Sequence, residues 1–248
     1  MAPRVVVLSL ASDFGCQVQL SNMTEEILDV LGVIDLSYWQ LASSGHMPAD
    51  YDVAVVEGAV TTDEHVELLR RVRKTAAAVV AIGSCANIGG IPALANLVDL
   101  GERYTAVYGE GSVQVAKGRQ APMPIDSVIE VDYRVPGCPI DTGEFLRTLS
   151  RVLLGLSDRV PGQTMCASCK TNLNTCFFDR GELCLGLVTR AGCDARCPTL
   201  GRPCTGCRGL APDANLASAR AIAAAAGRGA DELDEGLRIY NTAKEVRG

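Results

Sequence analysis

Cysteine thiolates are the side chains with the clearest chemical potential in this sequence. Eight of the eleven cysteines lie within residues 166–207, and they form two consecutive groups of four. The first group is Cys166, Cys169, Cys176 and Cys184, and the second is Cys193, Cys197, Cys204 and Cys207. Four thiolates are what a tetrahedral zinc ion or an iron–sulfur cubane requires. The pattern therefore predicts two metal centres in this segment.

Two kinds of metal centre compete for these groups. Paired Cys-x2-Cys motifs are typical of structural zinc. Iron–sulfur clusters accept more variable spacing and often have proline beside a ligand cysteine, as in Cys197-Pro198 and Cys138-Pro139. Glycines in the segment would let backbone amides approach cluster sulfurs, namely Gly186, Gly192, Gly206 and Gly209. The spacing favours iron–sulfur clusters and leaves zinc as the alternative.

The other three cysteines each follow a short apolar run. Cys16, Cys85 and Cys138 come after β-branched segments, and Glu57 ends another such segment. Loops at the carboxyl ends of parallel strands converge on the crevice where open α/β sheets bind ligands. A lone cysteine there is more often a small buried hydrophobe. Three on the same edge, each near glycine or proline, predict a shared site.

The segments that would position these residues alternate between strands and helices over residues 1–160. The candidate strands are Arg4–Leu10, Ile34–Trp39, Asp52–Glu57, Ala77–Ile82 and Ser127–Val135. Candidate helices cover residues 21–31 and 62–74, the second capped by Thr61 or Thr62. Near-continuous apolar strands separated by helices indicate a parallel sheet covered on both faces. We predict an α/β domain of the flavodoxin-like, doubly wound type.

The composition changes after residue 160. Residues 161–210 are rich in cysteine, glycine and proline with only short apolar runs, so this segment needs bound metal to organise it. We predict a separate small module here. Residues 211–248 are alanine-rich and charged, which favours a helical extension, with Asp213 as a candidate cap and Gly227 and Gly229 between two helices.

Charge and composition exclude several functions. The net charge of -6 and the single Trp39 argue against nucleic-acid binding. The apolar runs are too short for a membrane span or a secretion signal, so we expect a cytoplasmic protein without membrane insertion. In a reducing compartment, clustered cysteines indicate metal binding before disulfides. The two histidines, His46 and His65, are expected at the surface.

Three motifs carry a family resemblance. They are Gly83-Ser84-Cys85-Ala86-Asn87-Ile88-Gly89-Gly90-Ile91-Pro92, Val135-Pro136-Gly137-Cys138-Pro139 and Pro203-Cys204-Thr205-Gly206-Cys207-Arg208-Gly209. In this order they resemble the small, electron-transferring subunit of nickel–iron hydrogenases. Residues 184–193 are similar to the soluble cytoplasmic branch, which includes the NADP-reducing sulfhydrogenase delta type and the deazaflavin-reducing hydrogenase gamma type. The similarity extends over both the predicted sheet domain and the cysteine-rich module.

The resemblance implies three clusters: a proximal one beside the nickel–iron site of a large subunit, and medial and distal ones in the cysteine-rich module. The distal [4Fe-4S] ligands are matched by Cys166, Cys169, Cys176 and Cys184, and the medial ligands by Cys193, Cys197, Cys204 and Cys207. Periplasmic members have proline at one medial position and a three-iron cluster, so four cysteines here imply a medial [4Fe-4S] centre. Glu57 matches an acidic strand-end position, for which we expect a proton-relay or structural role.

The proximal site departs from the family pattern. Cys16, Cys85 and Cys138 match three proximal ligands, but the family's Cys-x2-Cys motif reads Cys16-x2-Gln19 here. Three outcomes are open: a non-cysteine ligand, a three-iron ([3Fe-4S]) cluster, or no proximal cluster. Asp13 is a better oxygen ligand than the neutral amide of Gln19, and Ser21 is more remote in sequence. We expect a proximal [4Fe-4S] cluster with Asp13 as its fourth ligand.

The expected function is that of an oxidoreductase subunit that relays electrons from a nickel–iron large subunit to NAD(P)-reducing flavin and iron–sulfur subunits. No cysteines remain for nickel, and no GxGxxG fingerprint follows a strand, so hydrogen activation and dinucleotide binding are expected on partner chains. One alternative is an iron–sulfur subunit of the respiratory quinone reductase, whose adjacent cysteine pair is missing at Cys16. The other is a zinc-stapled binding module without redox function.

Overall fold

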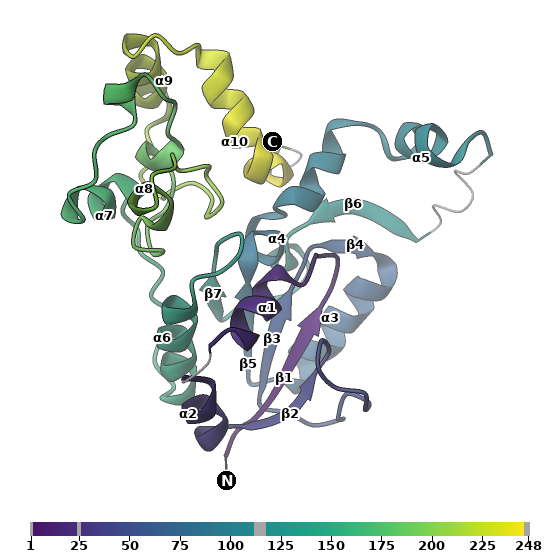
Figure 1. The fold of residues 1–248 in the computed structure, drawn as a ribbon. Helices are drawn as coiled ribbons and strands as arrows, with labels where there is room; N and C mark the ends of the chain where they lie inside the picture. Colours follow the sequence, from purple (N-terminus) through teal and green to yellow (C-terminus); the bar gives the residue numbers. More distant parts are fainter. Residues whose placement is uncertain (1, 24–25, 112–117, 246–248) are drawn as a thin grey trace.

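A five-stranded parallel sheet forms the centre of the N-terminal part of the chain (Figure 1). The computed structural model describes residues 2–23, 26–111 and 118–245. The strands, in the spatial order β2-β1-β3-β5-β7, are β1 Arg4–Ser9, β2 Asp35–Trp39, β3 Val53–Glu57, β5 Ala78–Ile82 and β7 Tyr133–Val135. The chain proceeds from β1 to β2 on one side and then to β3 on the other. The prediction of a doubly wound α/β fold is therefore confirmed.

The strand register aligns the carboxyl ends of four strands. Ser9 of β1 pairs with Glu57 of β3, Glu57 with Ile82 of β5, and Ile82 with Val135 of β7. Each of these residues is the last of its strand. The loops that follow β1, β3, β5 and β7 consequently leave the sheet at one edge, side by side.

Helices cover both faces of the sheet, because successive strand side chains point to opposite sides. Val6 and Leu8 pack with Leu69 and Val72 of α3 on one face. Val5 and Val7 pack on the other face with α1 and α6. These elements are α1 Gly15–Ser21, α2 Glu26–Val33, α3 Asp63–Thr75, α4 Gly83–Ile88 and α6 Thr142–Leu153. Both faces of the sheet are buried, as near-continuous apolar strands predict.

Two predicted elements differ from the observed ones. The helix expected over residues 21–31 corresponds to α2, which begins later, at Glu26, and α1, which ends at Ser21, was not predicted; Thr24 and Glu25 lie outside the described residues. The strand expected over 127–135 is shorter, because β5 offers lateral partners only to residues 133–135. Helix α3 begins as expected, with the Thr62 hydroxyl accepting from the His65 N–H.

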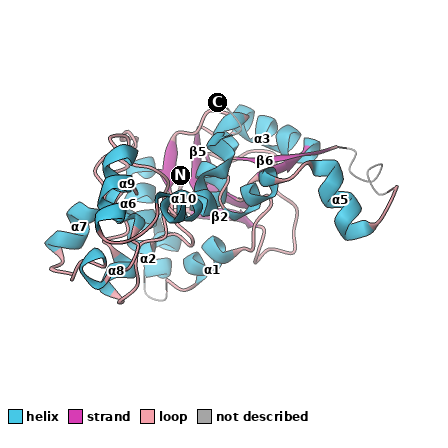
Figure 2. Cartoon of the chain, turned by 90° about the horizontal axis from the view of Figure 1, so that it is seen from above, coloured by secondary structure: helices cyan, strands magenta, loops and turns pink. Residues whose placement is uncertain are grey.

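A smaller group of elements extends from one side of the sheet. It comprises β4 Val60–Thr62 paired antiparallel with β6 Arg119–Met123, two short 3-10 helices, η1 Ile91–Leu97 and η3 Ile125–Ser127, and α5 Leu100–Tyr108. In both views α5 and β6 lie on the side away from the cysteine-rich segment (Figures 1 and 2).

The cysteine-rich segment and the C-terminal helices pack together. The segment contains α7 Met165–Thr171, η4 Phe178–Arg180, η5 Leu185–Leu187 and α8 Arg196–Thr199, and the chain continues with α9 Leu216–Ala225 and α10 Ala230–Glu245. Leu185 and Val188 share one core with Leu233 and Leu237 of α10. Gly227 and Gly229 lie between α9 and α10, as predicted. The domain boundaries at residues 160 and 210 stay predictions.

One capping prediction was wrong. Asn215, rather than Asp213, caps α9: its side chain accepts from the Ser218 N–H at 2.8 Å. Within the described ranges, no helix is both long and apolar enough to cross a membrane.

Candidate metal centres

The aligned strand ends bring Cys16, Cys85 and Cys138 to one pocket. Cys16 is the second residue of α1, Cys85 lies in α4 directly after β5, and Cys138 follows β7 by three residues. All three line the pocket, together with Asp13 and Glu57. Residues far apart in sequence thus meet at the carboxyl edge of the sheet, where open α/β sheets bind ligands.

Two carboxylates line this pocket, and Asp13 is the one predicted as an oxygen ligand. It precedes α1, and its Oδ1 accepts from the Gly15 N–H at 2.9 Å. Gln19 lies one turn along α1 and does not line the pocket, and neither does Ser21, whose hydroxyl donates to the Val18 carbonyl. The Asp13-x2-Cys16 pair, and not Cys16-x2-Gln19, therefore faces the other cysteines.

The backbone around the pocket leaves room beside the thiols and directs hydrogen-bond donors at them. Gly83 adopts φ +82°, and a Cβ there would lie 2.6 Å from the Cys16 Sγ. The backbone N–H groups of Ile140 and Ile91 lower the pKa of Cys16 and of Cys85, and the Tyr240 hydroxyl of α10 lowers that of Cys138, as hydrogen-bond donors near a sulfur do. Hydrogen bonds to cysteine sulfur and closely approaching backbone are features of iron–sulfur sites, so this donor set fits such a cluster.

Burial opposes ionisation of these thiols in the absence of a cation. It raises the pKa of Cys85 to about 12 and raises the pKa of Cys16 and of Cys138 as well. Neighbouring Asp13 and Glu57 carboxylates raise the Cys85 pKa further. An inert thiol of this kind is no nucleophile, whereas a bound metal deprotonates a coordinating thiol outright. The pocket is therefore suited to metal ligation rather than to covalent catalysis.

Glu57 is buried at the end of β3. Its Oε1 accepts from the Cys16 N–H at 2.9 Å, so it fixes the start of α1. Its Oε2 has no hydrogen-bond partner among the described residues, and burial raises the Glu57 pKa. The hydrogen bond supports the structural role expected for Glu57; the proton-relay role stays a prediction.

The first group of four cysteines gathers around α7. Cys166 and Cys169 lie on the helix, Cys176 is in the exposed loop after it, and Cys184 directly precedes η5. Burial raises the pKa of Cys166 to about 11, and Cys184, Cys169 and Cys176 each raise it further. Mutual influence of this kind requires all four thiols to lie near one another.

The second group lies between the first group and the sheet. Burial raises the pKa of Cys207 to about 12, with contributions from Cys193 and Cys197. Cys204 is buried near both Cys184 and Cys207, and its N–H lies 3.2 Å from the Cys184 Sγ. The two groups therefore adjoin at Cys204 and Cys184.

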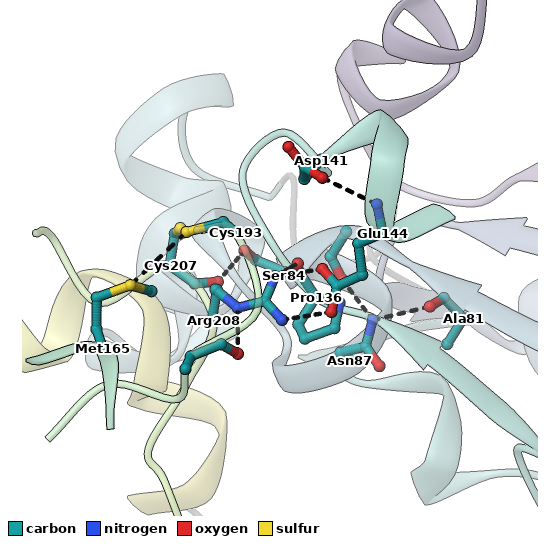
Figure 3. Close-up of polar contacts among 12 residues, drawn as sticks. Ala81, Ser84, Asn87, Pro136, Asp141, Glu144, Met165, Cys193, Cys207 and Arg208 are labelled. Atoms are coloured by element: carbon teal, nitrogen blue, oxygen red, sulfur yellow. Dashed lines mark hydrogen bonds and ion pairs between the residues drawn. The ribbon is translucent and has the colours of Figure 1, made fainter. Parts of the chain in front are cut away.

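Direct contacts also join the second group to the sheet edge. The Ser84 hydroxyl donates to the Cys207 carbonyl (Figure 3). The Cys138 N–H also lies close enough to the Cys207 sulfur to lower the pKa of that thiol. Ser84 lies within one of the motifs that carry the family resemblance, but the sequence predicted no role for it. Tyr240 was missed altogether, because this residue lies beyond the resembling region in an alanine-rich, charged stretch that gives no chemical signal.

Other potential ligands stay apart from these groups. His46 is exposed, and His65 is half-buried on α3 with Nδ1 3.3 Å from the Thr61 N–H; neither lines the proximal pocket. In the part of the chain that the structure describes, no three His, Cys, Asp or Glu side chains, the cysteine groups included, are close enough to hold a single metal ion. The ligands of an iron–sulfur cluster bind different iron atoms and are spaced more widely, so this finding concerns single ions such as zinc.

Comparison with known proteins identifies the family. Residues 14–152 match the family model described as NADH ubiquinone oxidoreductase, 20 Kd subunit. The sulfhydrogenase 2 subunit delta of Pyrococcus furiosus is 32% identical over 211 residues, covering 85% of this chain and 87% of that protein. The chain belongs to this family, in its branch of nickel–iron hydrogenase small subunits.

Further relatives extend this small-subunit assignment. A subunit of the F420-non-reducing hydrogenase vhu from Methanocaldococcus jannaschii is 30% identical, and the match covers 97% of this chain and 94% of that protein. The solved NAD+-reducing nickel–iron hydrogenase in the H2-reduced state is 28% identical, with a TM-score of 0.55 over 65% of this chain and 96% of that one. These matches indicate an electron-transferring iron–sulfur subunit of an oxidoreductase complex.

The similar proteins distinguish between the alternative functions. The relatives that cover both the sheet and the cysteine-rich segment are hydrogenase subunits, which favours the hydrogenase over the respiratory subunit. An electron-transferring iron–sulfur subunit is incompatible with a zinc-stapled module that has no redox role.

Proposed function

We propose that this small subunit carries electrons between the nickel–iron site of a large subunit and an NAD(P)-reducing partner that holds flavin and iron–sulfur groups. The observation that carries the proposal is the continuity of the three cysteine sets. The Cys138 N–H contacts Cys207 of the second group, and the Cys204 N–H contacts Cys184 of the first group. Contacts between neighbouring ligands support three cofactors in a line.

The proximal site would be formed by Cys16, Cys85, Cys138 and Asp13. All four line one pocket, and the donor set of three thiolates and a carboxylate suits a [4Fe-4S] cluster with one oxygen ligand. A [3Fe-4S] cluster held by the cysteines alone is the alternative. Such clusters, when bound, accept and release single electrons; the chain supplies spacing, burial and hydrogen bonds to the sulfurs.

The module would hold two [4Fe-4S] clusters. Cys193, Cys197, Cys204 and Cys207 form the medial set next to the sheet, and Cys166, Cys169, Cys176 and Cys184 form the distal set farther out. Cys176 of the distal set and Cys138 of the proximal set are both exposed, which supports access of a partner chain at each end of the proposed path. We further propose that the chain divides into a sheet domain of residues 1–160, a cysteine-rich module of residues 161–210 and a helical extension of residues 211–248.

The electron acceptor is proposed to be NAD(P), reached through partner subunits. The Pyrococcus relative is a sulfhydrogenase subunit, and the hydrogenase HoxS delta subunit of Cupriavidus necator, 28% identical over 165 residues, comes from an NAD-reducing enzyme. Relatives named as subunits of F420-non-reducing hydrogenases point to other carriers. The acceptor therefore needs a direct assay.

Metal analysis and acceptor assays test the proposal on the complex purified with its native partners. We expect about a dozen iron atoms and as many acid-labile sulfides per small subunit beyond those of the partners. Hydrogen-dependent reduction of NAD or NADP should exceed that of a deazaflavin. Zinc in place of iron would reject the clusters, and reduction of deazaflavin alone would reject the proposed acceptor.

A further inference from the structure

The guanidinium of Arg208 lies in the interior where the cysteine-rich module meets the sheet domain. Its side chain has no exposed surface, and that of Glu144 is only 9% exposed. The two form a bidentate ion pair: Nη1 and Nη2 of Arg208 donate to the two Glu144 carboxylate oxygens at 2.7 Å each (Figure 3). Glu144 belongs to the first turn of α6, and its N–H is held by the Asp141 carboxylate that caps the helix.

Arg208 reaches three cysteine-bearing loops. It directly follows Cys207 in sequence. Its Nε donates to the Ala191 carbonyl at 3.0 Å, two residues before Cys193, and its Nη1 donates to the Pro136 carbonyl, two residues before Cys138. Gly192 makes room for it, since a Cβ there would overlap the Arg208 Nη2. The Arg208 side chain thus connects the loop that carries Cys138 of the proposed proximal site with the loops that carry Cys193 and Cys207 of the proposed medial site.

Stability alone does not account for a buried ion pair at this place. Desolvation of the two charges offsets much of their Coulomb attraction, and well-packed apolar side chains in place of a buried ion pair often stabilise a protein equally well. Both charges lie close to the medial cysteines. Arg208 directly follows Cys207, its hydrogen bond to Ala191 holds the guanidinium near Cys193, and the Glu144 carboxylate lies against that guanidinium. The cation and the carboxylate therefore exert opposite fields on the medial cysteines.

An electron added to a cluster increases its negative charge. A nearby buried cation favours the reduced state and a nearby carboxylate disfavours it, because such fields are weakly screened inside a protein. We propose that the Arg208–Glu144 pair sets the reduction potential of the medial cluster, with Arg208 raising it and Glu144 limiting the increase. The inference rests on the proposed function, in which Cys193, Cys197, Cys204 and Cys207 hold that cluster.

Two single substitutions with opposite expected effects test the inference in the complete hydrogenase complex. Glu144→Gln leaves the cation uncompensated and should raise the medial midpoint potential. Arg208→Gln leaves the carboxylate uncompensated and should lower it. Each should change the equilibrium between medial and proximal reduction about tenfold, which is about 59 mV for one electron. The double variant should return close to the wild-type potential. Redox titration followed by electron paramagnetic resonance (EPR) measures all three.

The direction of the shifts separates an electrostatic role from a purely structural one. Loosened packing would move both single variants the same way, and that result, or unchanged potentials with the clusters in place, overturns the inference. Glu144→Gln preserves shape and carries the test alone if Arg208→Gln does not fold, and Arg208→Lys should keep the potential near wild type.

A distant ion pair provides the matched control. Arg73 and Asp132 pair at the opposite, amino-terminal edge of the sheet, so Asp132→Asn should leave the medial potential unchanged. Absence of iron and sulfide from the wild-type small subunit would reject the proposed function itself. Intact clusters with the wrong shifts would reject only the assignment to Arg208 and Glu144.

Discussion

At the scale of single residues, the fourth proximal ligand depends on which side of Cys16 faces the pocket. Helix α1 begins at Gly15, so residues after Cys16 follow the helix away from the strand ends. Asp13 lies in the loop that leaves β1, where its carboxylate meets the three cysteines. A carboxylate is a harder ligand than thiolate, so the iron bound by Asp13 should differ from the three irons bound by cysteine.

Replacing Asp13 tests this ligand. Asp13→Ala should leave three thiolates at the proximal site, so that mild oxidation produces a [3Fe-4S] EPR signal that wild type lacks. Gln19→Ala is the matched control: it lies at the same spacing on the other side of Cys16, outside the pocket, and should match wild type. A three-iron signal in wild type that Asp13→Ala does not change would rule out Asp13 as ligand.

Gly83 makes a second residue-scale prediction. Alanine there combines an unfavourable positive φ with a Cβ 2.6 Å from the Cys16 Sγ. We expect Gly83→Ala to lower the free energy of unfolding by about 1–2 kcal/mol for the backbone and roughly 1–3 kcal/mol more for overpacking. It should also reduce proximal iron. Urea denaturation and iron analysis of anaerobic protein measure both effects.

Gly155→Ala is the control that separates the two contributions expected for Gly83→Ala, the unfavourable positive φ and the close contact of the new Cβ. Gly155 has φ +63° with no neighbouring atom within 4 Å, so its substitution should cost only the backbone part and retain iron. Equal losses for the two variants would mean that the contact with Cys16 is unimportant.

Site residues could be predicted from the sequence only where residue type and spacing indicate their chemistry. Cysteine spacing identified the ligand candidates because ligand chemistry restricts residue type and sequence distance together. The links made by Ser84, Arg208 and Tyr240 had no such signal. Each depends on a through-space contact with a segment far away in sequence, for example Arg208 with Glu144, 64 residues apart.

At the scale of elements, the C-terminal helices support the cysteine-rich module. Leu185, one residue after Cys184, packs with Leu233 and Leu237 of α10 and with Ala219 and Ala223 of α9. Helix α10 also contacts η1 and α4 next to the proximal pocket. The two helices therefore give the module an apolar core that its own sequence lacks.

Leu233→Ala tests this support. Leu233 is completely buried, so its truncation should lower the free energy of unfolding by about 2–5 kcal/mol and release iron from the module more readily. Leu200→Ala, at a leucine of the cysteine-rich module that is 71% exposed, should change the free energy of unfolding by no more than about 0.5 kcal/mol. Similar iron loss in both variants would show that α10 does not stabilise the module.

The strands were predicted correctly where the sequence is continuously apolar. Predictions failed where contacts with other elements determine the length or packing of an element. The runs that became β1, β3 and β5 are continuously apolar, and their existence and order followed from sequence. The length of β7 did not, because it is limited by lateral pairing with β5. The sharing of one core by η5, α9 and α10 involves segments that each look too short or too polar to pack alone.

At the scale of the whole molecule, the three cysteine sets form a path away from the sheet edge. Cys138 adjoins Cys207, Cys204 adjoins Cys184, and Cys176 of the same set as Cys184 is exposed. The order was expected from family resemblance, whereas the contacts between successive sets could be learned only from the fold. In a linear path, interrupting the last site should block delivery of electrons without affecting chemistry at the first.

Cys176→Ala tests the linear order in the complete complex. Removing a distal ligand should reduce hydrogen-dependent NAD(P) reduction to background, because electrons cannot leave the chain at its exposed end. Exchange of hydrogen isotopes at the large subunit's nickel–iron site should persist, since that reaction needs no net electron transfer. Cys85→Ala, at the proximal set, should impair electron delivery equally while leaving the EPR signals of the distal set intact. If Cys176→Ala retains NAD(P) reduction, electrons leave at another site and the distal position of this set is wrong.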